Sequence, residues 1–203
     1  MKTKIETLLL SPQTVFTVDD LAVLWKISER SKLWESIKYY LRTGRLRPIQ
    51  RGVYSIVDDY SPFEAAVKIF PPAYISFITA LAFHGTYFQY TDAIHVMART
   101  SRRINLTDEH PIVYHQLKKE MLLNQDGLYK HEGYWIASLE RAICDTSYLE
   151  PGFVFEHIDK ANPGELERLS QLYENRALSK RIQKLISTVE EKEEQSDVRS
   201  EKT

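Results

Sequence analysis

The segment 30–56 constrains the fold most, because it combines an amphipathic helix with a short hairpin. Its first half carries apolar side chains at helical spacing, namely Leu33, Ile37, Tyr40 and Leu41. Gly44 follows, and glycine is the usual residue just after a helix. Two short runs of β-forming residues then flank the turn residue Gly52. The sequence therefore predicts a helix over residues 30–43 and a β-hairpin over residues 45–56.

Two further helices are expected before this pair. Residues 2–10 have helical propensity and end before a Ser-Pro dipeptide. Thr17 can cap a second helix, whose first turn contains Asp19 and Asp20. A helix, a helix-turn-helix and an arginine-rich hairpin are typical of a winged-helix DNA-binding domain, expected here over residues 1–57. The third helix would enter the major groove, and hairpin arginines would contact phosphates or the minor groove.

Charge is unevenly distributed along the chain. The 203 residues carry a net charge of −1, yet residues 1–55 hold ten basic and five acidic side chains. A basic segment in a neutral chain favours a local polyanion partner. The predicted DNA-binding residues lie on the polar face of the third helix and along the hairpin: Ser31, Lys32, Lys38, Arg42, Arg45, Arg47 and Arg51. Protein-interaction modules can have the same elements, and this face would then only be solvated.

The remainder predicts a second, mixed α/β domain over residues 61–187, so that the fold class is α+β. Helices are expected at 62–70, 77–84, 139–149, 163–173 and 178–190, with Ser61, Ser76 and Ser138 as caps. Strands are expected at 94–98, 112–117 and within 128–134. The charged residues 188–203 are expected to be a disordered tail.

Motifs of catalysis are missing from the sequence. It contains no GxxxxGK[ST], GxGxxG, GxSxG or HExxH pattern, and Cys144 is its single cysteine. We therefore expect no enzyme activity, no catalytic residue, no metal site, no cofactor and no disulfide framework. The longest stretch without a charged residue, between Lys68 and Asp92, is too polar for a membrane span. A cytoplasmic protein that does not bind membranes is expected.

The most suggestive polar residues of the second domain are Glu140, Arg141 and Asp145. Arg141 and Asp145 are four residues apart, so they can pair on one helix face. A surface pair or a structural clasp is the plainer interpretation, and a direct functional role is the other. Cys144 on the same helix is interpreted as a buried structural thiol, and His84 as a packed or hydrogen-bonded histidine.

Three blocks of sequence together resemble the AbiEi family of AbiE-type antitoxins. The first runs from Phe16 through the Gly44-Arg45-Leu46 and Arg51-Gly52-Val53-Tyr54 segments, the second covers residues 74–85, and the third covers residues 137–145. The blocks occur in the family's order and span about residues 16–150. In the second domain, the residues that match the family motifs are Ser76, His84, Glu140, Arg141 and Asp145.

This resemblance implies a bacterial antitoxin that also represses its own transcription. The winged helix would bind inverted repeats in double-stranded DNA of its own promoter. The second domain would counteract a nucleotidyltransferase-like toxin in a type IV toxin–antitoxin system, without requiring a stable complex, and the phenotype would be phage defence by abortive infection.

Two other functions stay open at the level of sequence. A ligand-sensing winged-helix transcription factor would have no toxin partner and would release DNA when a small molecule binds. An interaction scaffold would show no salt-dependent DNA binding. A toxin-like gene next to this one would favour the antitoxin.

Overall fold

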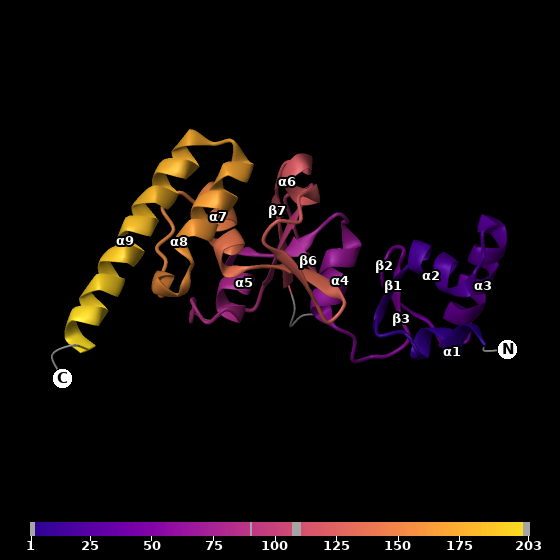
Figure 1. Ribbon diagram of the computed structural model, residues 1–203. Helices are drawn as coiled ribbons and strands as arrows, with labels where there is room; N and C mark the ends of the chain where they lie inside the picture. The colour runs from indigo at the N-terminus through magenta and orange to yellow at the C-terminus, as the bar shows by residue number, and fades with distance from the viewer. Residues whose placement is uncertain (1–2, 90, 107–110, 201–203) are drawn as a thin grey trace.

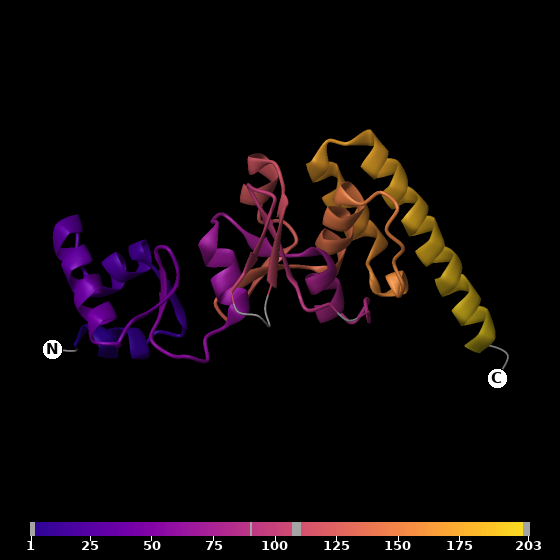
Figure 2. The same ribbon diagram turned by 180° about the vertical axis from the view of Figure 1, so that it is seen from behind.

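The chain adopts an α+β fold with two separate sheets. The computed structural model describes residues 3–89, 91–106 and 111–200, and the side chains only as far as Val189. The N-terminal helices and the long C-terminal helix lie at opposite ends of the molecule, and the larger sheet lies between them (Figures 1 and 2).

The N-terminal part consists of three helices and a small sheet. Its elements are α1 (Lys4–Leu9), β1 (Val15–Thr17), α2 (Val18–Trp25), α3 (Arg30–Arg42), β2 (Arg47–Gln50) and β3 (Val53–Ser55). The strands are antiparallel in the order β1-β3-β2. The predicted helices and hairpin are present, whereas strand β1 was not predicted. Leu8, Phe16, Leu21, Ile37 and Leu46 form the buried centre of this part.

Local signals fix the ends of these helices. Thr17 caps α2 as predicted: its hydroxyl accepts a hydrogen bond from the Asp20 amide at 3.1 Å, and the Asp20 carboxylate accepts one from the Thr17 amide at 2.9 Å. This reciprocal pair satisfies two amides that the helix cannot pair internally. Beyond the end of α3, Gly44 has a φ of 69°, which glycine adopts without steric cost.

The larger sheet has six strands in the order β6-β7-β5-β4-β9-β8. They are β4 (Tyr74–Ile75), β5 (Ile94–Ala98), β6 (Arg102–Asn105), β7 (Pro111–Gln116), β8 (Leu128–His131) and β9 (Tyr134–Ala137). The region 128–134, expected to form strand, contains β8 and the first residue of β9. A turn at Glu132 and Gly133, both with positive φ, reverses the chain there and makes β8 and β9 an antiparallel hairpin.

Helices flank this sheet and extend beyond it. They are α4 (Pro62–Ile69), α5 (Phe77–Phe83), α6 (Lys119–Leu123), α7 (Leu139–Leu149), α8 (Pro163–Ser170) and α9 (Arg176–Ser200), with 3-10 turns at Ile158–Lys160 and Gln171–Tyr173. Ser61 and Ser138 cap α4 and α7 as predicted. One hydrophobic core, extending from Ala66 to Val189 in the sequence, joins the sheet to α5 and to α7–α9.

Helix α9 continues to Ser200 and so includes most of the segment expected to be a disordered tail from Thr188. The buried side chains Leu178, Ile182, Ile186 and Val189 anchor the first half of α9. The residues that follow are rich in Glu, Lys and Gln, which favour helix once a helix has started. Residues 201–203 lie outside the described residues.

Candidate nucleic-acid interface

Helix α3 presents a basic face to solvent. Leu33 and Ile37 are buried on its inner side, which directs Lys38 and Arg42 outward on the opposite side. The seven residues predicted to bind DNA are all exposed: Ser31, Lys32, Lys38, Arg42, Arg45, Arg47 and Arg51. The fold thus leaves every one of them accessible to a partner.

The start of α3 is less available than its middle. Lys32 Nζ lies 2.6 Å from a Glu29 carboxylate oxygen, and the Ser31 hydroxyl donates a hydrogen bond to Glu29 at 2.6 Å. Lys32, and then Ser31, lower the pKa of Glu29. One turn from each other, Lys38 and Arg42 line a shallow depression with Glu35 and Tyr39, and the Arg42 guanidinium lies 6.0 Å from the centre of the Tyr39 ring. Lys38 and Arg42 therefore form the more accessible cationic pair.

The β2–β3 hairpin carries the other predicted cations. Arg47 is ion-paired with Asp58. Arg51 lies in the turn between the two strands, next to Gly52, whose φ is 82°. Within the described residues, Arg45 and Arg51 take part in no ion pair. Arg51 is therefore the cation that the hairpin presents most freely at its tip.

A groove of about 580 Å³ separates α3 from the hairpin. Trp34 and Leu41 line it from α3, and Pro48, Gln50 and Arg51 line it from the hairpin. Trp34 belongs neither to the apolar stripe nor to the polar face of α3, so helical periodicity does not single it out. Its side chain is 36 % exposed. Arg51 thus borders the same groove as one flank of α3.

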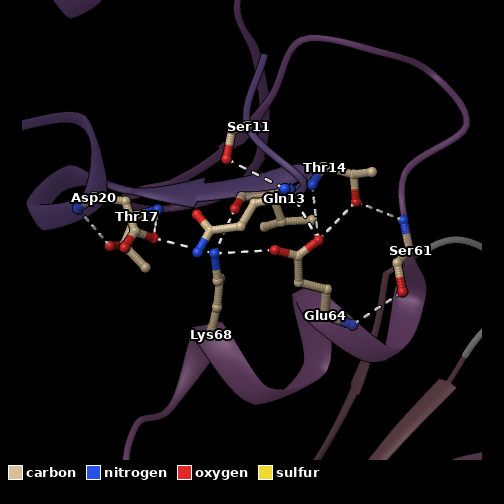
Figure 3. A network of polar contacts seen from close by, with 9 residues as sticks. Ser11, Gln13, Thr14, Thr17, Asp20, Ser61, Glu64 and Lys68 are labelled. Carbon is tan, nitrogen blue, oxygen red and sulfur yellow. Dashed lines mark hydrogen bonds and ion pairs between the residues drawn. The ribbon is translucent and has the colours of Figure 1, made fainter. Parts of the chain in front are cut away.

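A polar network fixes the N-terminal part to α4 (Figure 3). One oxygen of Glu64 accepts hydrogen bonds from the amide and hydroxyl of Thr14, at 2.9 and 2.8 Å. Lys68 Nζ donates to the Val15 carbonyl at 2.6 Å and lies 3.2 Å from the Asp20 carboxylate. Asp20 belongs to the capping box of α2, so the network connects α4 directly to the start of that helix.

The residues of the second-domain motif do not form one site. Arg141 and Asp145 are fully buried, with Arg141 Nε 3.6 Å from Asp145 Oδ1. Glu140 lies apart from them and accepts a hydrogen bond from the Asn162 amide at 3.1 Å. His84 Nε2 lies 2.9 Å from the Ala137 carbonyl oxygen, so it is a hydrogen-bonded histidine as interpreted from the sequence.

Three hydroxyl groups complete the environment of the buried pair. Tyr74, Ser76 and Tyr173 each donate a hydrogen bond to the Asp145 carboxylate, at distances of 2.5–3.1 Å. Ser76 was expected to cap α5, but its hydroxyl forms no capping hydrogen bond and binds Asp145 instead. Burial, then the Asp145 charge, raises the pKa of both tyrosines.

The surroundings of Arg141 are those of a structural clasp. Its guanidinium donates to the Asp126 and Met121 carbonyls and to the Tyr74 hydroxyl, all at 2.8–2.9 Å. Burial opposes its charge, but Asp145 and Tyr74 outweigh this effect, so the pKa of Arg141 is raised. Cys144 is also buried, and burial raises the pKa of its thiol. The pair is therefore not the surface pair that the sequence also allowed, and its contacts are those of a buried clasp.

Neither a metal-binding cluster nor a membrane-spanning helix occurs among the described residues. No group of three or more His, Cys, Asp or Glu side chains in that part of the chain could hold a metal ion. Likewise, none of the described helices combines the length and the apolar character that a membrane crossing requires.

Comparison with known proteins shows a similarity of fold to a solved structure. No family model matches the chain, and no curated protein matches it. Among solved structures, the RV2827C protein from Mycobacterium tuberculosis is similar, with a TM-score of 0.51 and 14 % sequence identity. The match covers 91 % of this chain and 75 % of that protein. At this identity the similarity concerns the fold alone.

Proposed function

We propose that the N-terminal part is a winged helix-turn-helix that binds duplex DNA. In this proposal α3 is the recognition helix in the major groove, and the β2–β3 hairpin is the wing. The order of elements and the β1-β3-β2 sheet support the assignment. A recognition helix needs an outward polar face with its apolar side held in a core, and α3 has both.

One observation carries the proposal most strongly. Arg51 at the hairpin tip borders the groove that Trp34 lines from α3, and Lys38 follows Trp34 by one helical turn. The two elements that border this groove thus both carry exposed cations: Arg51 lines the groove itself, and Lys38 lines a separate depression on α3. Phosphate contacts position a protein on DNA while base contacts specify the sequence, and these two elements supply candidates for both kinds of contact.

We infer further that the chain is the antitoxin and autorepressor of a type IV toxin–antitoxin system. The wing would bind inverted repeats of its own promoter, and the second domain, proposed for residues 61–187, would counter a nucleotidyltransferase-like toxin. The support for this step is the family resemblance carried by the three sequence blocks. Arg141 and Asp145 of that resemblance would preserve the shape of the second domain, since both are fully buried.

Binding of the promoter fragment by single variants tests the DNA-binding proposal. Arg42→Ala on α3 and Arg51→Ala on the hairpin should each weaken binding in fluorescence anisotropy. Lys130→Ala is the matched control, because Lys130 is an exposed cation on β8 of the other sheet. Equal affinity of all three variants and the unmodified chain would refute the proposed interface.

The antitoxin step is tested separately in cells. A nucleotidyltransferase-like protein encoded beside this gene is expressed with or without this chain, and growth is measured. Rescue by Arg51→Ala together with lost promoter repression would support two separable activities. Failure of the unmodified chain to rescue would remove the antitoxin role and leave DNA binding standing.

A further inference from the structure

A further pocket is lined by residues of α7, the segment that follows it and α9, and these helices lie away from the N-terminal part (Figure 1). The pocket has a volume of about 370 Å³ and lies among the end of α7, the segment 151–158 and α9. Phe153, Phe155, Ile158 and Leu185 supply much of its apolar lining. This volume and this apolar character are those of small-molecule sites, which typically measure about 300–1,000 Å³.

The polar side of the pocket is cationic. Arg181 and Lys184 line it from α9, one turn apart on the same side of that helix, and no carboxylate residue is among the lining residues that the structure describes. Lys184 is exposed and Arg181 is partly buried. An anionic group at this side would therefore meet two positive charges without a competing acid.

The Arg181 guanidinium is already oriented. Its Nε and Nη2 both donate to the Ser147 carbonyl, at 3.1 and 2.9 Å. Ser147 is in the last turn of α7, where a carbonyl has no partner within its own helix. This double contact fixes the guanidinium plane. The remaining nitrogen, Nη1, forms no hydrogen bond with any described residue, so its N–H groups are available to a ligand. A fixed guanidinium with free N–H groups suits recognition of an oxyanion.

Ser147 adds an independent sign of a missing partner. It lines the pocket, its side-chain oxygen is buried, and this oxygen has no hydrogen-bond partner among the described residues. Buried hydroxyl groups in folded proteins are normally hydrogen-bonded.

We propose that this pocket binds a small organic acid with an acyl or aryl body. Arg181 and Lys184 hold the acid group, while the phenylalanines and Leu185 enclose the apolar body. The proposal stands independently of DNA binding and of the antitoxin role. It also gives the ligand-sensing alternative a defined site to test.

Titration calorimetry of the intact chain with decanoate, and with decanol as its uncharged analogue, tests the site. Decanoate should bind saturably with one molecule per chain, and decanol should bind at least about tenfold more weakly, as expected when a charge-assisted contact is lost. Binding of both with equal affinity would overturn the assignment of an acid. Absence of saturable decanoate binding would overturn the site itself.

Variants at exposed positions locate the binding without disturbing the core. Lys184→Met should weaken decanoate binding roughly fivefold, the effect of one partly solvated charge. Val154 lines the pocket and is 81 % exposed, so Val154→Asp should place a repelling charge beside the acid and weaken binding by a similar factor. Lys130→Met on β8 is the matched control and should bind normally. Unchanged affinity in both pocket variants would refute the proposed location.

Discussion

Replacing Arg141 with methionine should destabilise the second part of the chain strongly. Methionine keeps much of the side chain's length but removes its charge and all its donors. Three acceptors then lose their donor, namely the Asp126 and Met121 carbonyls and the Tyr74 hydroxyl. Asp145, fully buried, keeps three hydroxyl donors but loses its only ion-pair partner among the described residues.

The expected size of the effect follows from burial. Removing one partner of a buried ion pair costs about 3–5 kcal/mol, because the remaining charge is left uncompensated away from water. A domain of this size has a total stability of about 5–15 kcal/mol. Arg141→Met should therefore remove a large share of the free energy of unfolding. Adding Asp145→Leu to the Arg141→Met chain should cost less than Asp145→Leu does alone, because the two residues are coupled.

Urea unfolding followed by circular dichroism measures this effect. Arg168→Met is the matched control, because Arg168 forms its ion pairs with Asp126 and Glu165 at the surface, and exposed ion pairs contribute little. The control should unfold close to the unmodified chain. A loss below about 1 kcal/mol for Arg141→Met would refute the reasoning that the buried pair is a structural clasp.

Three further predictions concern pH, DNA and the domain boundary. Burial, then His115 and Arg103, lowers the pKa of His95 to about 4, below its usual 6.5. The unfolded chain then binds a proton at this position more readily than the folded chain does. The contribution of His95 to the free energy of unfolding should therefore be fully present above pH 6.5 and should fall by up to about 3 kcal/mol toward pH 4. His95→Gln should flatten this decline in urea titrations at several pH values, and an unchanged slope would contradict it. Arg51→Ala should weaken cognate and random DNA alike in gel shifts, whereas Arg42→Ala should cost about 1–3 kcal/mol more on cognate DNA if it reads a base; equal losses for both would contradict the docking. A fragment starting at Asp59 lacks the Thr14 donors to Glu64, so hydrogen exchange should show weakened α4 but protected α7, and loss of protection throughout would show that residues 61–187 cannot fold alone.

Helix starts were predictable because their signals are local. Thr17, Ser61 and Ser138 each cap a helix through an amide three residues away, so a short stretch of sequence contains the whole interaction. The neighbouring strands with which a strand pairs, by contrast, can lie far away in the sequence. The two residues of β4 pair with β5 and β9, and the three residues of β1 pair with β3. Such short strands carry no alternation that a sequence pattern could reveal.

The candidate sites likewise combine local features, which the sequence predicts, with features that depend on tertiary packing. The exposure of Lys38 and Arg42 follows from helical periodicity, so α3 could be described from sequence. The pairing of Arg141 with Asp145 was also predictable, but its burial was not. Burial depends on Tyr74 and Tyr173, which reach Asp145 from 71 and 28 residues away along the chain. Likewise, Trp34 gains its position beside the hairpin only through tertiary packing.

The salt dependence of promoter binding tests the central claim most directly. The N-terminal part presents its cations on α3 and the hairpin, and four to six neutralised phosphates would release their counterions on binding. The logarithm of the association constant should then fall against the logarithm of salt concentration with a slope of about −4 to −5. A slope near zero, or no binding of the promoter fragment at low salt, would contradict DNA binding as the function of this chain.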